Sequence, residues 1–151
     1  MNEIFKHEFR AGWGQMDYNA HMGNTAYLDI SADTRFRFFE ANGFTAADFE
    51  REKVGPVVMR DVIDYHAEIR LQEGFSVTFE LLGLSDDGSR FRLRNTFLKA
   101  DGRVAAVVTT DAGWMSLANR RLVTPPNELL IAMSRLTRSD DFEMLPSSIN
   151  K

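Results

Sequence analysis

Hydrophobic residues recur at helical spacing in the segment from Asn24 to Ala41. Apolar side chains at steps of four, four and three draw one stripe along a helix: Leu28, Ala32, Phe36 and Phe39. Ile30 and Phe38 widen this stripe, so we expect the helix to be covered on more than one side. Asn42-Gly43 is a typical helix end. At 1.5 Å per residue, such a helix is about 27 Å long and crosses a whole sheet.

Alternating hydrophobic and polar residues predict strands on both sides of this helix. Rough alternation from Ile4 to Met16 directs Ile4, Phe9, Ala11 and Trp13 inward, with Phe5 breaking the pattern. A short helix is expected from Thr45 to Lys53, with Thr45 as its cap. The later strands are expected at Val57–Leu71, Phe75–Leu84, Arg90–Ala100 and Arg103–Leu117, joined by turns at Gln72-Glu73-Gly74, Ser85–Gly88 and Asp101-Gly102.

The end of the chain lacks the alternation of the predicted strands. Pro125-Pro126 introduces a short helix from Asn127 to Leu136, and the residues from Thr137 to Lys151 are polar and expected to form a loose tail. The order of strand, long helix and several hairpin-linked strands predicts an α+β fold, with one helix lying on an antiparallel sheet. Because 151 residues show no break in composition, we expect one domain at residues 1–136 and a tail at 137–151.

Composition narrows the functional classes. The net charge of −4 and the absence of a basic stripe argue against a nucleic-acid or anionic-membrane surface. The chain has no cysteine, which excludes disulfides and cysteine nucleophiles, and its three histidines lack metal-ligand spacing. It shows neither a signal-peptide core nor an apolar run of about 20 residues. We expect a cytoplasmic protein without a metal, membrane or nucleic-acid partner.

The candidate chemistry lies in the polar link before the long helix. Asp17 and His21 occupy this link, and the side chain of Asn24 is expected to cap the helix. Free N–H groups at a helix N-terminus favour negative charge, so a carboxylate beside them suits chemistry on a carbonyl group. The alternative is structural: Asp17 is a favoured turn residue. Likewise, His21 either orients Asp17, lines the pocket, or closes the loop through a backbone hydrogen bond.

The pattern Asp17-x-x-x-His21-Met-x-Asn24-x-x-Tyr27-Leu28 resembles the signature of the 4-hydroxybenzoyl-CoA thioesterase-like acyl-CoA thioesterases. Further features fall where that family places them: Gly74, Gly88, Gly102, Arg120-Arg121 and Pro125. The resemblance covers residues 3–136. It implies a hot-dog fold, in which a five-stranded antiparallel sheet wraps the long helix. Two chains then pair their sheets edge to edge, with active sites at the subunit interface.

The resemblance also implies roles for individual residues. Asp17 matches the catalytic carboxylate, acting as nucleophile or as general base. The backbone N–H of Asn24 falls where a helix N-terminus polarises the thioester carbonyl. His21 occurs in only part of the family, and the helical Glu of other members has no match here, since Asp29 and Asp33 are the nearest helical acids. The implied reaction hydrolyses an acyl-CoA to a free acid and CoA, with no cofactor besides the CoA of the substrate.

Four further residues are candidates for substrate binding: Tyr27, Asp64, His66 and Arg90. We expect Tyr27 to be core or pocket wall. Asp64 and His66 lie mid-strand and either reach a partner's site or, as we favour, alternate toward solvent. Arg90 begins a strand with alternating arginines, which either meets the CoA phosphates or is a solvated face.

Two other functions compete with hydrolysis. A hot-dog enoyl-CoA hydratase has four residues between its Asp and His and a following Pro, whereas three residues separate Asp17 from His21 here. A non-catalytic acyl-thioester-binding protein, such as a ligand sensor, would need an effector domain for which this chain has no room. Exposed edge strands and a helix that is apolar on more than one side predict a homodimer or homotetramer. The sequence leaves the acyl group open.

Overall fold

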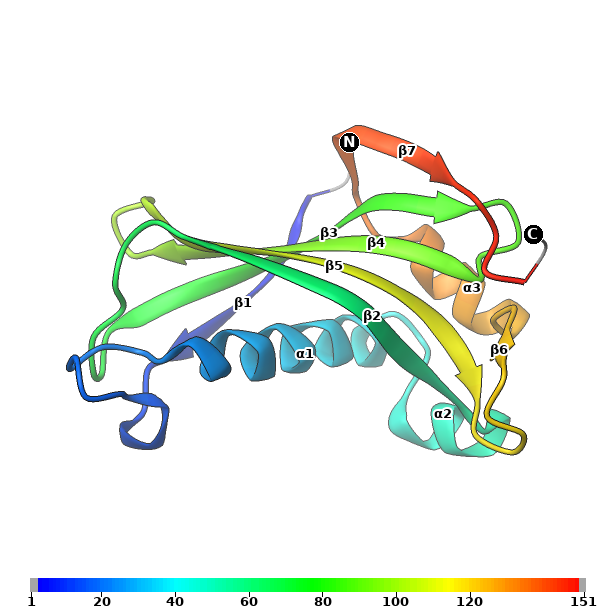
Figure 1. The fold of residues 1–151 in the computed structure, drawn as a ribbon, viewed down its shortest axis with the longest axis horizontal. Helices are drawn as coiled ribbons and strands as arrows, with labels where there is room; N and C mark the ends of the chain where they lie inside the picture. Colours follow the sequence, from blue (N-terminus) through cyan, green and yellow to red (C-terminus); the bar gives the residue numbers. More distant parts are fainter. Residues whose placement is uncertain (1–2, 150–151) are drawn as a thin grey trace.

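A computed structural model describes residues 3–149 and shows one long helix lying along the inner face of a curved sheet (Figure 1). The strands are β1 (Phe5–Arg10), β2 (Val54–Tyr65), β3 (Gly74–Ser85), β4 (Arg90–Lys99), β5 (Val104–Ser116), β6 (Leu122–Val123) and β7 (Arg138–Leu145). The helices are η1 (Trp13–Gln15, a 3-10 turn), α1 (Asn24–Ala41), α2 (Ala46–Glu52) and α3 (Asn127–Ser134). The predicted α+β architecture is confirmed. None of these helices is both long and apolar enough to cross a membrane.

The sheet contains the expected five antiparallel strands and two more. Its main path runs β1-β3-β4-β5-β2, while β6 pairs with β5 and β7 pairs with β3, giving seven strands among the described residues. The strand expected at Val57–Leu71 lies instead at Val54–Tyr65. It ends there because the N–H groups of His66 and Ala67 both donate to the carbonyl of Ala105, at 2.8 and 3.0 Å, which turns the chain out of the ladder.

The first strand is shorter than predicted and faces the helix differently. Phe5, rather than breaking the alternation, packs edge-on against Phe38 of α1 with ring centroids 5.5 Å apart. Ile4 and Trp13, which were expected to face inward, are 46% and 80% exposed. The strand ends at Arg10 and η1 follows, so the alternation predicted from Ile4 to Met16 holds only for the part that pairs with β3.

Helix α1 has the predicted bounds, but the sheet covers a different face from the one expected. Leu28 and Phe36 of the predicted stripe are 37% and 39% exposed. The buried residues are Ala26, Tyr27, Ile30, Ser31, Thr34, Phe38 and Phe39. A polar pair, Ser31 and Thr34, lies on this buried side, and Thr34 donates its hydroxyl to the carbonyl of Ile30 at 2.8 Å. An apolar face of α1 is therefore left uncovered within one chain.

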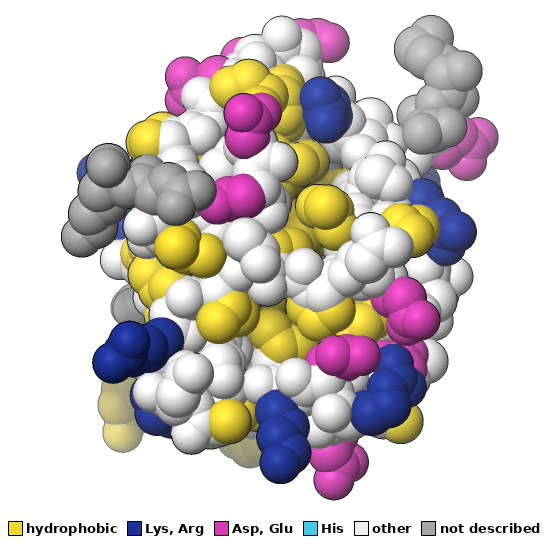
Figure 2. Space-filling model, turned by 90° about the vertical axis from the view of Figure 1, so that its right-hand side faces the viewer, with side chains coloured by type: hydrophobic (Ala, Val, Ile, Leu, Met, Phe, Trp, Pro, Cys, Tyr) yellow, Lys and Arg dark blue, Asp and Glu magenta, His cyan; other side chains and the backbone are white. Residues whose placement is uncertain are grey.

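The core has two parts, one at each end of α1. Around the start of α1, Tyr27 and Ile30 pack against Val77, Phe97 and Val108 of the sheet. Around its other end, the core is built of larger rings and reaches α2 and α3: Phe38, Phe39, Phe44, Phe79, Phe91 and Trp114. Figure 2 views the end of the molecule that carries α2, β6 and α3, where hydrophobic side chains gather in a hollowed centre and charged ones around it.

The expectation of a loose C-terminal tail is wrong for residues 138–145. These residues form β7, which pairs in parallel with β3 from Leu81 to Ser85. The strand β1 pairs with β3 only as far as Phe79, so the remaining edge of β3 is free to accept β7. Gly83 lets Leu145 approach, since an added Cβ would lie 2.9 Å from the Leu145 Cγ. The polar sequence of β7 shows no strand pattern, because pairing with β3 rather than an apolar face of its own stabilises this strand. Residues 150 and 151 of the predicted tail lie outside the described residues.

Candidate active site

The link between η1 and α1 holds Asp17 in a tight turn. The Asp17 Oδ1 accepts a hydrogen bond from the N–H of Asn19 at 2.8 Å, and the Asp17 N–H donates to the carbonyl of His21 at 3.0 Å. Ala20 adopts a left-handed conformation with φ of 64°, which a non-glycine residue rarely takes. The turn thus fixes one oxygen of the Asp17 carboxylate and leaves the other, Oδ2, outside it.

The start of α1 adjoins this carboxylate, although the capping differs from the prediction. Gly23, not Asn24, is the N-cap, and Asn24 is the first helical residue, so the Asn24 side chain does not cap. A Cβ added to Gly23 would lie 3.4 Å from the Cβ and 3.9 Å from the Oδ2 of Asp17. Among residues 3–149, no acceptor pairs with the Asn24 N–H, as is typical of the first turn of a helix. The free donor thus belongs to the residue after Gly23, and the Asp17 carboxylate lies against Gly23.

His21 closes the loop toward the backbone. Its Nδ1 lies 3.1 Å from the carbonyl oxygen of Met22, which can only accept, so the contact assigns a proton to Nδ1. The same nitrogen is 3.9 Å from the Asp17 Oδ2, which is too long for a hydrogen bond. The backbone of His21 also bridges to Arg70. Of the three roles open in the sequence, the structure shows two: the backbone contact, and a place in the lining of a hollow beside Asp17.

An open hollow of about 520 Å³ brings several predicted residues together. Its lining comes from the link, the start of α1 and the end of β2: Asp17, His21, Met22, Asn24, Tyr27, Tyr65, His66, Ala67 and Glu68. Tyr65 and Glu68 were not among the predicted site residues; they lie at the end of β2 and in the turn after it, within the segment predicted as one strand at Val57–Leu71. Among the described residues, no group of three His, Asp or Glu side chains is placed to hold a metal ion.

Two predicted site residues lie elsewhere within this chain. Asp64 is exposed on β2 and does not line the hollow. Arg90 lies at the other end of the sheet, where it pairs with Gly113. The strand position level with the hollow is Phe97, seven residues along β4: it pairs with Ala106, and Ala106 pairs with Tyr65. At 3.3 Å per residue, Arg90 is thus about 23 Å from that end of the sheet.

Tyr27 forms the inner side of the hollow. It is 2% exposed and makes tilted or edge contacts with Tyr65 and Phe97, at centroid distances of 5.3 and 4.9 Å. Burial raises the pKa of Tyr27 to about 12, and the nearby Tyr65, Glu73 and Asp17 add to this shift. Its phenol therefore keeps its proton at neutral pH, so it can donate a hydrogen bond but cannot serve as a base.

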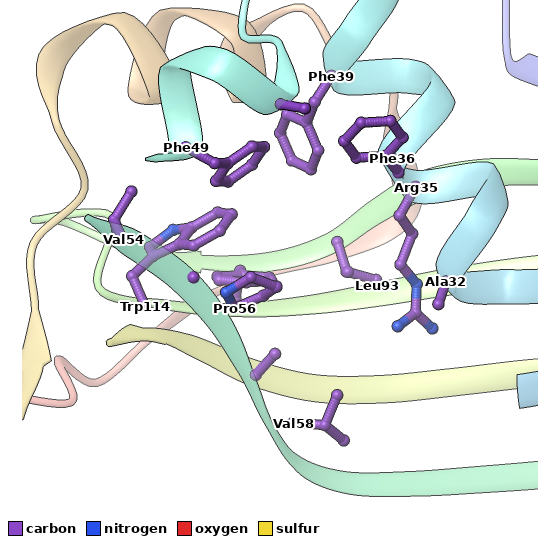
Figure 3. Close-up of a pocket in the computed structure, with 14 residues that line it drawn as sticks. Ala32, Arg35, Phe36, Phe39, Phe49, Val54, Pro56, Val58, Leu93 and Trp114 are labelled. Carbon is purple, nitrogen blue, oxygen red and sulfur yellow. The ribbon is translucent and has the colours of Figure 1, made fainter. Parts of the chain in front are cut away.

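A second, largely apolar cavity of about 370 Å³ lies between α1, α2 and β2 (Figure 3). Aromatic rings dominate its lining: Phe36, Phe39, Phe49, Phe91 and Trp114. Among the described residues that line this cavity, only Arg35 is charged. The sequence does not single out Arg35, because its partners Asn95 and Thr110 lie 60 and 75 residues away along the chain.

Residues 11–133 match the Thioesterase-like superfamily. The chain belongs to this superfamily. A curated relative is the L-carnitine dehydrogenase/betainyl-CoA thioesterase of Agrobacterium fabrum, which is 26% identical over 135 residues. The match covers 89% of this chain but only 27% of that protein, so the chain spans about a quarter of the relative's length.

Solved structures that are similar to this chain have the same fold. A hypothetical protein from Staphylococcus aureus, solved in complex with CoA, superposes with a TM-score of 0.80 at 22% identity, covering 89% of this chain and 84% of that chain. The 1,4-dihydroxy-2-naphthoyl-CoA thioesterase of Synechocystis superposes with a TM-score of 0.76 at 13% identity, covering 87% and 96%. The predicted hot-dog fold is confirmed.

Proposed function

We propose that this protein is an acyl-CoA thioesterase, releasing a free acid and CoA. The observation that carries the proposal is the Asp17 carboxylate beside the free N–H of Asn24, in an open hollow at the start of α1. Membership of the Thioesterase-like superfamily supports it, as do the curated relative named as a betainyl-CoA thioesterase and the neighbour solved with CoA.

The geometry allows the reaction to proceed in two ways. In both, the thioester oxygen accepts a hydrogen bond from the Asn24 N–H, which stabilises the negative charge that develops on this oxygen. In the first, the Asp17 Oδ2 attacks the carbonyl carbon, the C–S bond breaks, and water hydrolyses the resulting mixed anhydride. In the second, Asp17 takes a proton from a water that attacks directly. Either route yields the acid and the CoA thiol.

The remaining candidates take supporting positions in this proposal. Tyr27 and His66 line the hollow beside the thioester, and His21 holds the loop that carries Asp17. Asp64 and Arg90 reach a substrate only where a second chain brings them to it. The reaction needs neither a metal nor a redox cofactor. A cytoplasmic location fits a cysteine-free chain acting on a CoA thioester.

We also propose that the chain assembles through β2 as a homodimer, or as a homotetramer built from two such dimers. This twelve-residue strand is an edge of the sheet, with β5 on one side only. Val58, Val62 and Tyr65 on it are 49%, 38% and 53% exposed. Beside them lies the uncovered face of α1 with Leu28 and Phe36. A long apolar edge of this kind is normally covered by another chain.

Replacing Val62 with lysine is expected to convert the assembly into monomers, because a buried charge on the edge strand opposes pairing. Light scattering coupled to gel filtration measures the mass at micromolar protein. Ile131→Lys on α3, where Ile131 is 44% exposed, is the matched control and should keep the assembly. A wild-type monomer, or an intact dimer in Val62→Lys, would rule out this interface.

The proposed activity is tested by offering the protein a panel of acyl-CoA thioesters and detecting free thiol. Thiol release with at least one member is the expected result. Loss of an enoyl-CoA double bond without thiol release would indicate a hydratase instead. Tight binding of acyl-CoA in calorimetry without either reaction would indicate a non-catalytic acyl-thioester-binding protein.

A further inference from the structure

Arg35 is anchored between α1 and the sheet by two fully buried side chains. Its Nε donates to the Oδ1 of Asn95 at 2.9 Å, and its Nη2 donates to the Oγ1 of Thr110 at 2.7 Å. Asn95 and Thr110 are both 0% exposed. The Thr110 hydroxyl in turn donates to the Oδ1 of Asp61 at 2.5 Å, so a carboxylate stands one hydrogen bond away from the guanidinium.

The hydrogen bonding of this guanidinium is incomplete. Arginine has five N–H donors, and the two described contacts leave three without an acceptor among residues 3–149. Burial lowers the pKa of Arg35 to about 10, against the opposing effect of Asp61. The group therefore remains charged at neutral pH. Arg35 is half-buried and its unused donors remain accessible, so water or an oxygen of a ligand can reach them.

Arg35 lines the apolar cavity. Figure 3 shows the Arg35 side chain extending from α1 into the space between helix and sheet, with Phe36, Phe39, Phe49 and Trp114 around the rest of it. A cavity of about 370 Å³, mostly apolar with one polar group, is typical of a small-molecule site.

The cavity also lies on the same helical face as the proposed reaction site. Asn24, Leu28 and Ala32 follow one another at steps of four along α1, and Ala32 lines the cavity together with Arg35. Leu28 and Ala32 are exposed within one chain, so the helix offers a path from its first turn to the cavity, and in the proposed dimer this path runs between α1 and the second chain. An acyl chain held at Asn24 by its thioester can follow this path.

We propose that Arg35 makes this site prefer acyl thioesters whose acyl chain ends in a carboxylate. The inference rests on the proposed thioesterase function and names the substrate class. The methylene chain would pack against the rings, and the terminal carboxylate would accept from the unused guanidinium N–H groups, a charge-assisted contact that arginine forms well. A quaternary ammonium end would suit the rings through cation–π contact, but the charge of Arg35 opposes it.

The test compares thioesters in matched pairs that differ only at the chain end: butyryl- with succinyl-CoA, octanoyl- with suberyl-CoA, and dodecanoyl- with dodecanedioyl-CoA. In wild-type protein, kcat/KM for the carboxylate member is expected to exceed that for the plain member at least about tenfold in one pair, because a site built to pair a polar group discriminates strongly. Arg35→Met should abolish or reverse that ratio, and Arg35→Lys should restore part of it.

A second pair of variants leaves the Arg35 contacts untouched. Ala46 is exposed, lines the cavity and begins α2, where an acidic residue is well tolerated. Ala46→Asp should lower the ratio at least about threefold by repelling a carboxylate, whereas the neutral Ala46→Asn should leave it unchanged. This comparison holds even if Arg35→Met proves unable to fold.

Distinct outcomes separate the inference from the proposed function. If wild-type protein cleaves both members of every pair equally, or prefers plain or betainyl thioesters, the role of Arg35 is refuted while the thioesterase stands. If the ratio is unchanged by Arg35→Met and by Ala46→Asp, the preference has another source and the role is likewise refuted. If no thioester is cleaved, the proposed function fails and the inference fails with it.

Discussion

Asp17→Asn is expected to lower kcat for thioester hydrolysis by about 10²–10⁴-fold, the range typical of losing a catalytic acid–base group. Asparagine keeps the shape of the side chain and can still accept a hydrogen bond from the Asn19 N–H, which lies 2.8 Å from Oδ1 in the wild-type protein. It replaces Oδ2 with an NH2 group, which neither attacks a carbonyl nor takes a proton from water. The fold should therefore persist while the reaction is lost, as measured by free-thiol release and thermal unfolding.

The control for this variant is Asp29→Asn. Asp29 is an exposed acid on α1, five residues from Asn24, and its replacement makes the same change in charge near the same helix end. Activity within about twofold of wild type is expected, because no reacting group is removed. Full activity in Asp17→Asn, or an equal loss in both variants, would show that the Asp17 carboxylate does not carry the reaction.

Asp87→Ala is expected to lower the free energy of unfolding by about 2–4 kcal/mol, since it removes several hydrogen bonds to one charged group. The Asp87 Oδ1 accepts from the hydroxyls of Ser85 and Ser89 at 2.8 and 2.7 Å, and its Oδ2 accepts from the hydroxyl of Ser147 at 2.6 Å. Ser85 and Ser89 are buried. The carboxylate thus joins the β3–β4 hairpin to the segment after β7. Urea unfolding measures the loss, and hydrogen exchange should show faster exchange in β7.

The same carboxylate predicts how stability depends on pH. Burial alone would raise the pKa of Asp87, but the hydrogen bonds from Ser147 and Ser89 outweigh it and hold the pKa well below its ordinary value of about 4. Because the folded-state pKa is the lower one, this stabilisation is present above about pH 4 and is lost as the pH falls toward the folded-state value. Wild-type protein should therefore lose more stability on acidification than Asp87→Ala.

Asp86 provides the control for both measurements. It is the exposed neighbour of Asp87 in the same turn, so Asp86→Ala should change stability by no more than about 0.5 kcal/mol and should keep the acid dependence of wild type. An equal loss of stability in Asp86→Ala, or parallel acid profiles for wild type and Asp87→Ala, would contradict this role of Asp87.

Local patterns in the sequence determined much of the fold. The bounds of α1 from Asn24 to Ala41 follow from helical spacing and the Asn42-Gly43 stop, and both agree with the structure. The hairpins at residues 85–88 and 101–102 likewise follow from turn residues next to alternating strands. Asp17, His21, Asn24 and Tyr27 meet in one hollow because a short link and the first turn of a helix keep them close along the chain.

Only the tertiary structure decided which partners those elements meet. The curvature of the sheet buries Tyr27 and Phe38 of α1 and leaves Leu28 and Phe36 exposed. Because the helix is apolar on two sides, its sequence does not indicate which side the sheet covers. The strand β7 forms because β3 has a free edge beyond Phe79, which no local pattern reveals.

The site shows the same division. The sequence by itself determined the pairing of a carboxylate with a helix start, since both lie within a few residues of each other. It could not place Arg90, about 23 Å along the sheet from the hollow, nor find Arg35, whose partners Asn95 and Thr110 are 60 and 75 residues away. Contacts across such separations depend on strand register and sheet curvature, and these are properties of the packed chain as a whole.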